Sequence, residues 1–127
     1  MINSKFAVLF LICFSVACSS FAQLGLKIGM SKPMVSQAIA QGGWLQIALG
    51  IGLNPWVVGG LTLYFFGAVV WLFVLAKVQL SFAYPFVGLG FILTMFLGKF
   101  VMDDDLSLQR LVGTLVVVVG VLLIAVE

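Results

Sequence analysis

The chain has 127 residues, of which 64% are hydrophobic and only 8% are charged, whereas a soluble domain carries roughly 25% charged residues. Six Lys or Arg residues against four Asp or Glu residues give a net charge of +2, which is too small to indicate nucleic-acid binding. The sequence has no histidine and only two cysteines, which excludes most zinc and haem ligand sets and any His-dependent catalytic triad. We therefore expect an integral membrane protein that is not an enzyme and needs no metal or cofactor.

Four apolar runs are long enough to cross a bilayer, since a spanning helix needs roughly 20 residues. They predict an all-α membrane protein with four transmembrane helices in a single domain, residues 1–127. The expected spans cover about residues 6–27, 55–77, 82–102 and 108–126.

Residues that favour helix starts stand in front of these runs. Asn54 occupies an N-cap position and Pro55 the first helical position, a favourable start for the second span. Ser81 is placed to cap the third span, and Pro85 falls in its first turn, where proline is tolerated. The aspartates at 103–105 precede the fourth span, where acidic groups suit the positive end of the helix dipole.

The segment between the first two spans, residues 30–53, has a different character. It is rich in Gln, Gly and Ser, and its apolar stretch from Trp44 to Leu53 is too short to span. We interpret it as an interfacial or re-entrant segment that is partly helical.

The first run also resembles a secretory signal, because Lys5 precedes it and Ser20-Phe21-Ala22 forms a small-x-small cleavage site. Cleavage of residues 1–22 would leave three spans. Polar residues continue the helical pattern past Ala22, which favours a retained helix.

The basic residues divide two against four between the two sides of a four-span chain, so both membrane orientations stay open.

Polar residues recur at every fourth position of the first span: Ser15, Ser19, Gln23 and Lys27. This spacing places them on one face of a helix, and such a face is unfavourable against lipid tails. One interpretation is hydrogen bonding to neighbouring helices. The other is one wall of a hydrophilic groove with Lys27 at its mouth.

The charges near the spans are cationic, and no span contains a carboxylate. Lys27 and Lys99 therefore suit an anionic substrate such as a phosphate, although both could simply extend to the membrane interface. Tyr64 and Trp71 in the second span and Tyr84 in the third are either packing residues or cavity residues. The candidate substrate-binding residues are Ser15, Ser19, Gln23, Lys27, Tyr64, Trp71, Tyr84 and Lys99.

Several strings resemble small proteins of the drug/metabolite transporter superfamily. Residues 19–27 (SSFAQLGLK) are similar to their first helix, and residues 78–85 (VQLSFAYP) to the start of their third helix. The segment from Asn54-Pro55-Trp56 to Leu75 resembles the second helix of EamA-type proteins, and the strings LVGT (111–114) and VGVL (119–122) resemble the closing helix. Order and spacing together indicate a four-helix fold like that of small-multidrug-resistance proteins.

The resemblance is greater to one branch of this group. Drug exporters of the group carry an essential glutamate in the first helix, where this sequence has Ser19, and Val87 replaces an aromatic residue of their third helix. The subunits that flip undecaprenyl phosphate-aminoarabinose lack the glutamate and share the strings Ala22-Gln23-Leu24 and Ala83-Tyr84. The resemblance implies a homodimer, or a heterodimer with a related small subunit, whose two chains form an inverted repeat around a midplane site.

We therefore expect a transporter or flippase subunit of the bacterial inner membrane that moves an amphipathic anion, a polyprenyl-phosphate-linked sugar. A membrane lipid or lipid-linked sugar would be its ligand, and nucleic acid would not be a partner. Two alternatives remain open at this point: a small-molecule or multidrug exporter of the same fold, and a non-transporting membrane assembly subunit.

Overall fold

The computed structural model describes residues 5–126, and every regular element in that range is helical. The elements are α1 (Lys5–Met30), α2 (Pro33–Gln41), α3 (Trp44–Gly52), α4 (Pro55–Leu75), α5 (Leu80–Ala83), the 3-10 helix η1 (Tyr84–Gly88), α6 (Leu89–Met102) and α7 (Leu108–Ala125). Within these described residues, four helical stretches are long and apolar enough to cross a membrane: α1, α4, the stretch Leu80–Met102, and α7. The predicted class, an all-α protein with four transmembrane helices, is confirmed, whereas the single-domain assignment stays a prediction.

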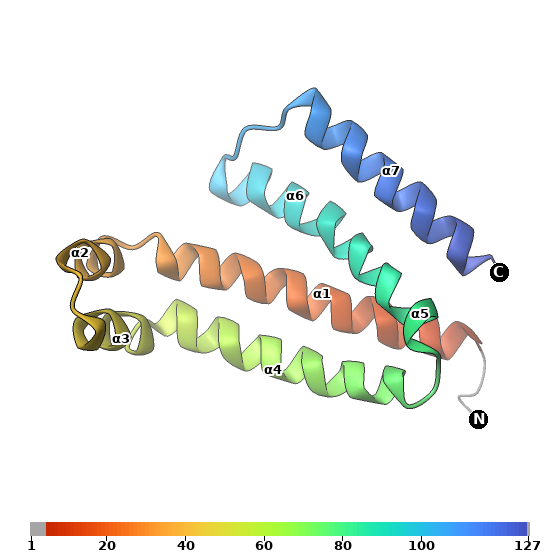
Figure 1. Ribbon diagram of the computed structural model, residues 1–127, viewed down its shortest axis with the longest axis horizontal. Helices are drawn as coiled ribbons and strands as arrows, with labels where there is room; N and C mark the ends of the chain where they lie inside the picture. The colour runs from red at the N-terminus through yellow and green to blue at the C-terminus, as the bar shows by residue number, and fades with distance from the viewer. Residues whose placement is uncertain (1–4, 127) are drawn as a thin grey trace.

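Helix α1 lies at the centre of the arrangement (Figure 1). It runs beside α4 along most of its length, and α6 packs against it on another side. Helix α7 contacts α6 and η1 and forms the outer edge of the molecule. Helix α1 therefore has neighbours on two sides, and of its polar stripe Ser15 is buried and Ser19 half-buried, whereas Gln23 and Lys27 are exposed.

Glycines allow α1 and α4 to approach closely. A Cβ atom built on Gly29 would lie 2.8 Å from Val57 Cγ2 and 2.9 Å from Asn54 Oδ1, and one on Gly67 would lie 3.0 Å from Cys18 Cβ. Small residues at such contacts let backbones pack directly, which is how helices associate where lipid provides no hydrophobic driving force. Gly25 and Gly29, four residues apart on α1, are the sequence signature of this contact.

Asn54 joins the ends of these two helices. Its Oδ1 accepts hydrogen bonds from the backbone N–H groups of Trp56 (2.9 Å) and Val57 (3.3 Å), which confirms the predicted N-cap. Its Nδ2 donates to the carbonyl of Gly29 at 3.0 Å. The same amide group therefore caps α4 and satisfies a carbonyl near the end of α1, where intrahelical partners run out.

The third span differs from the expectation in two respects. The span begins at Leu80, and Gln79 with its extended backbone occupies the N-cap position. Ser81 therefore lies inside the first turn and makes no cap, so the prediction of a Ser81 cap was wrong. The span is also interrupted by η1, in which Pro85 stands at the start. Proline has no N–H to donate to the helix, and the tighter 3-10 turn accommodates that loss.

Within the segment 30–53, Met30 still belongs to α1, and residues 33–52 form a hairpin of two short helices, α2 and α3, beyond the end of α1 and α4 (Figure 1). Gly42 ends α2 in the left-handed conformation with φ of 79°, which glycine adopts at little cost. Val35 is buried, whereas Trp44 and Leu53 are largely exposed. The segment is thus helical, as predicted in part, and its interfacial or re-entrant location stays a prediction.

The turn between α6 and α7 is tightly specified. Asp103 ends α6 with φ of 57°, in the left-handed region, and the N–H of Asp104 donates to the Gly98 carbonyl at 2.9 Å. Ser107 caps α7 by accepting from the Arg110 N–H at 3.2 Å. Arg110 Nη1 in turn donates to the Asp105 carbonyl at 2.7 Å. These bonds define the backbone path of the turn.

We expect Gly29→Ala to destabilise the protein, whereas Gly59→Ala should not. Forcing a methyl group into the α1–α4 contact should cost about 1–3 kcal/mol. A Cβ on Gly59 would meet no atom within 4 Å, so helix propensity should make that change neutral or favourable by up to about 1 kcal/mol. Unfolding in mixed detergent and SDS micelles measures both, and equal effects would contradict the close approach at Gly29.

Two substitutions of Asn54 separate its two roles. Asn54→Ala removes the N-cap and should lower the free energy of unfolding by about 0.5–2 kcal/mol. Asn54→Asp keeps the accepting oxygens and removes only the donor to Gly29, so it should retain most of the stability. The same unfolding assay tests the pair; an aspartate variant as unstable as the alanine variant would show that the bond to α1 dominates.

Candidate functional site

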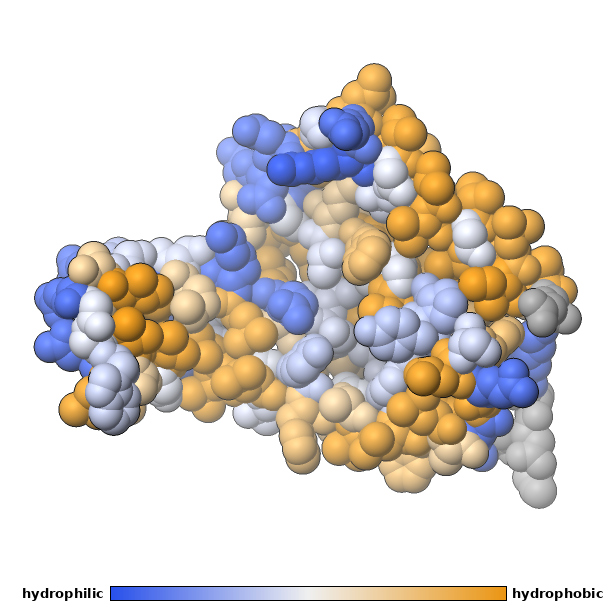
Figure 2. Space-filling model, viewed as in Figure 1, coloured by the Kyte–Doolittle hydropathy of each residue, from blue (hydrophilic) through white to orange (hydrophobic). Residues whose placement is uncertain are grey.

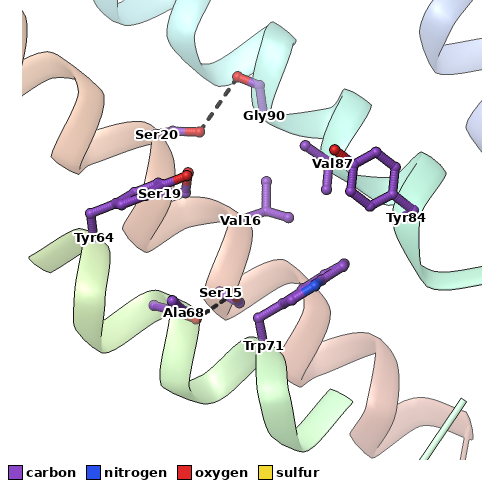
Figure 3. A pocket seen from close by; sticks show the side chains of 11 residues that line it. Ser15, Val16, Ser19, Ser20, Tyr64, Ala68, Trp71, Tyr84, Val87 and Gly90 are labelled. Carbon is purple, nitrogen blue, oxygen red and sulfur yellow. Dashed lines mark hydrogen bonds between the residues drawn. The ribbon is translucent and has the colours of Figure 1, made fainter. Parts of the chain in front are cut away.

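A cavity of about 210 Å³ lies between α1, α4 and the third span. Its lining combines hydroxyl groups, three large aromatic side chains and small residues (Figure 3). The lining residues are Ser15, Val16, Ser19, Ser20, Tyr64, Gly67, Ala68, Trp71, Tyr84, Val87 and Gly90. We call it the aromatic cavity.

Two serines of this cavity hold the helices together. Ser15 Oγ donates to the Gly67 carbonyl of α4 at 2.8 Å, and Ser20 Oγ donates to the Gly90 carbonyl of α6 at 3.4 Å. Both serines are buried. Interhelical hydrogen bonding, one of the two interpretations of the polar stripe, therefore applies to these two residues.

Ser19 lies between them and differs from them. It is half-buried and lines the cavity, and within residues 5–126 no hydrogen bond of its hydroxyl group is found. Figure 3 shows the Tyr64 ring reaching across toward it. The Ser19 hydroxyl is therefore the polar group of this stripe that a ligand in the aromatic cavity could meet.

The aromatic residues line open space instead of packing against one another. Tyr64 and Trp71 project from α4, while Tyr84 faces them from η1 on the other side of the cavity (Figure 3). Tyr64 is 45% exposed and Tyr84 is 61% exposed. Aromatic rings on opposite walls with free polar ends suit an amphipathic ligand, since each ring offers an apolar face and a hydrogen-bonding tip.

A second cavity, of about 240 Å³, continues along α1 toward its end. It shares Ser20 with the aromatic cavity, so that the two cavities follow one face of α1; we call them together the α1 seam. The lining residues are Ser20, Gln23, Leu24, Lys27, Thr94, Leu97, Gly98, Met102 and Asp104. We call this part the charged cavity, because Lys27 and Asp104 both line it.

The structure brings nearly all of the predicted substrate-binding residues into the seam. Ser15, Ser19, Tyr64, Trp71 and Tyr84 line the aromatic cavity. Gln23 and Lys27 line the charged cavity. Lys99 is half-buried on α6 and lines neither of them. Substrate binding by these residues stays a prediction. Lys99 is no longer included among the candidates, because it lines neither cavity.

Sequence reasoning missed the contribution of the α6–α7 turn. Asp104 enters the charged cavity from a loop that is 77 residues away from Lys27 in the sequence (104 against 27). Only the fold of the turn distinguishes it from its neighbours Asp103 and Asp105. Within residues 5–126, no three His, Cys, Asp or Glu side chains lie close enough together to hold a metal ion.

The fold and the seam define a class of protein: a multi-pass membrane protein in which a polar, aromatic-lined seam runs along one of four spanning helices. Curated relatives agree with this class. A probable 4-amino-4-deoxy-L-arabinose-phosphoundecaprenol flippase subunit ArnE of Pseudomonas aeruginosa (strain UCBPP-PA14) is 34% identical over 71 residues, which are 56% of this chain and 62% of that protein.

Two further relatives carry the same name. The subunit of Enterobacter sp. (strain 638) is 35% identical over 69 residues, 54% of this chain and 64% of the relative. That of Pseudomonas savastanoi pv. phaseolicola is 29% identical over 90 residues, 68% of this chain and 79% of the relative. No family model matches the chain, and no solved structure matches it.

These similarities confirm the resemblance that the sequence motifs indicated, to flippase subunits within a four-helix membrane fold. The match spans less than two thirds of the length of the first two relatives. The chain is a multi-pass membrane protein similar to bacterial flippase subunits, as predicted.

Ser15→Ala should lower the stability of the protein, whereas Ser19→Ala should not. Removing the Ser15 hydroxyl should lower stability by about 1 kcal/mol, as expected for an interhelical hydrogen bond in a membrane. Removing the Ser19 hydroxyl should leave stability unchanged and, if the polyprenyl phosphate expected from the sequence occupies the aromatic cavity, weaken its binding several-fold. Unfolding in mixed micelles and lipid-binding titrations measure the two effects. Equal loss of stability in both variants would make Ser19 a packing residue as well.

Proposed function

We propose that the chain is a subunit of a flippase that moves a polyprenyl-phosphate-linked sugar across the bacterial inner membrane. The observation that carries this proposal is the α1 seam, which joins an aromatic cavity to a charged cavity along one helix. An amphipathic lipid has the same order of chemistry: a polar, charged headgroup next to an apolar chain. The names of the relatives support the same class of substrate.

Lys27 is the residue that would hold the phosphate. It lies in the last turn of α1 and is exposed in the charged cavity. Within the described residues no Asp or Glu oxygen comes within 4.0 Å of it, so its ammonium group is free to pair with a ligand. A cationic side chain near the end of a membrane helix suits a phosphate that travels at the level of the lipid headgroups.

The lipid chain would remain in the bilayer while the headgroup uses the seam. Figure 2 shows this face of the molecule hollowed between α1 and α6, with weakly polar side chains in the hollow, strongly hydrophilic ones at its upper and left borders and apolar ones to the right and below. The aromatic cavity is bordered by Tyr64 and Tyr84, both exposed. A headgroup could therefore enter from the side, between helices, without withdrawing its long chain from the membrane.

A second copy or a related subunit would complete the route. Four helices in which α7 is mostly exposed cannot enclose a path across a bilayer. Two such subunits in opposite orientations would form an inverted repeat, an arrangement that permits alternating access around a site near the midplane. Homodimer and heterodimer both satisfy this requirement.

One observation favours a second candidate, a small-molecule exporter of the same fold. The aromatic cavity is lined by three large rings and no charged group, which suits a flat apolar or cationic compound. Its transport would not depend on Lys27. Substitution of that lysine therefore distinguishes the two candidates.

Lys27→Gln should reduce lipid translocation at least tenfold, because a charge-assisted contact to phosphate is replaced by a neutral one. The assay follows appearance of a radiolabelled polyprenyl phosphate sugar in the opposite leaflet of proteoliposomes that contain the chain with its partner subunit. Lys77→Gln, in the exposed turn after α4 and outside the seam, is the matched control and should retain activity. Wild-type protein that translocates no such lipid but exports aromatic compounds would favour the exporter.

A further inference from the structure

A further cavity, of about 460 Å³, lies between α6 and α7, and the proposed function does not use it. Helix α7 forms the outer edge of the molecule and is exposed along most of its length (Figure 1). The cavity therefore lies where two spanning helices meet the surrounding bilayer, and we call it the α6–α7 groove. Its walls include Phe91, Met95, Asp104, Arg110, Gly113 and Val117.

The groove runs from the membrane surface inward over about the depth of one lipid leaflet. Its polar end lies at the turn between the two helices, because Asp104 stands in that turn and Arg110 in the first turn of α7. It reaches Val117, nine residues after the first residue of α7, Leu108 (117 against 108). At 1.5 Å per residue this length is about 14 Å, which is about half of a hydrocarbon layer of about 30 Å.

Below the turn the walls of the groove are apolar, and its size suits a lipid chain. Phe91, Met95 and Val117 line it. The hydroxyl groups of Thr94 and Thr114, which also line it, donate to carbonyls of their own helices at 2.8 Å. A second helix, about 10 Å in diameter, would occupy about 1,100 Å³ over this length, more than twice the space available. The groove therefore fits a lipid chain better than a partner helix.

The polar end of the groove presents two opposite charges. Arg110 Nη1 donates to the Asp105 carbonyl at 2.7 Å, which holds the guanidinium in place. Within residues 5–126 no Asp or Glu oxygen lies within 4.0 Å of it, so its other N–H groups can meet a ligand. The carboxylate of Asp104 lies over Gly98 and lines the same end. The two side chains are not paired with each other, and a ligand with both charges could therefore pair with both.

We propose that the α6–α7 groove binds a phospholipid of the bilayer whose headgroup carries an ammonium group, phosphatidylethanolamine. Arg110 pairs with the phosphate, Asp104 with the ammonium group, and an acyl chain lies along the groove. A headgroup with phosphate alone meets Asp104 as a repulsive charge, so the carboxylate selects against it. The groove shares Thr94 and Asp104 with the charged cavity but not Lys27, and the inference does not depend on the proposed function.

The first test compares two phospholipids with identical chains, phosphatidylethanolamine and phosphatidylglycerol. Each is titrated into the full chain in detergent, and native mass spectrometry gives the dissociation constants. Wild-type protein should bind the ethanolamine lipid about tenfold more tightly, the size expected for a hydrogen bond to a charged group. Arg110→Gln should weaken both lipids by a similar factor. Asp104→Asn should abolish the preference, and Asp103→Asn, outside the groove, should retain it. A preference that is absent from wild-type protein, or that survives in Asp104→Asn, overturns the proposal.

The second test locates the lipid. Gly113→Leu fills the groove and should weaken both phospholipids at least tenfold. Gly120→Leu is the matched control, because Cβ atoms at both glycines of α7 would meet no atom within 4 Å but only Gly113 lines the groove. Equal effects of the two leucine variants overturn the proposal. Lys27→Gln should leave phospholipid binding unchanged, and a loss there would place the lipid in the α1 seam instead. The same spectra count the chains: a lipid-free dimer that Gly113→Leu dissociates would assign the groove to a second copy and also overturn the proposal.

Discussion

The close approach of α1 and α4 determines the placement of the other functional groups. Because glycines at 29, 60 and 67 remove side-chain volume from this contact, the two helices pack nearly backbone to backbone. Asn54 and Ser15 then add hydrogen bonds between them. With that side of α1 occupied, the stripe that carries Ser19, Gln23 and Lys27 is directed toward the gap beside α6. The α1 seam therefore follows from the packing of α1 against α4.

The sequence contains enough information to predict the spans and most of the seam. Apolar runs of about 20 residues predict spanning helices because the bilayer fixes their length, and a four-residue spacing of Ser15, Ser19, Gln23 and Lys27 predicts one face because the helix repeat fixes it. The spacing could not tell which hydroxyl groups are used for packing, since that depends on whether a carbonyl such as that of Gly67 lies opposite.

Features that depend on tertiary contacts could not be predicted from the sequence. Asp104 reaches the seam only because the turn after α6 folds back over Gly98, and nothing in three consecutive aspartates distinguishes the middle one. The close approach of Gly88 in the 3-10 segment to Val117 of α7 likewise depends on how the third span meets α7. By contrast, the four-residue spacing of Gly25 and Gly29 was present in the sequence and could have identified the α1–α4 contact.

The length of α1 gives the seam one more property. A helix of 26 residues is about 39 Å long at 1.5 Å per residue, and so exceeds a hydrocarbon layer of about 30 Å. Unless α1 tilts strongly, its Lys27 end lies among the hydrated lipid headgroups, while Ser15 and Trp71 lie in the hydrocarbon layer. The seam then follows a dielectric gradient, along which the attraction between opposite charges strengthens as water is lost. The charged groups of the seam stand at its hydrated end, so a headgroup that moves inward leaves Lys27 behind and meets hydroxyl groups and aromatic rings in the aromatic cavity.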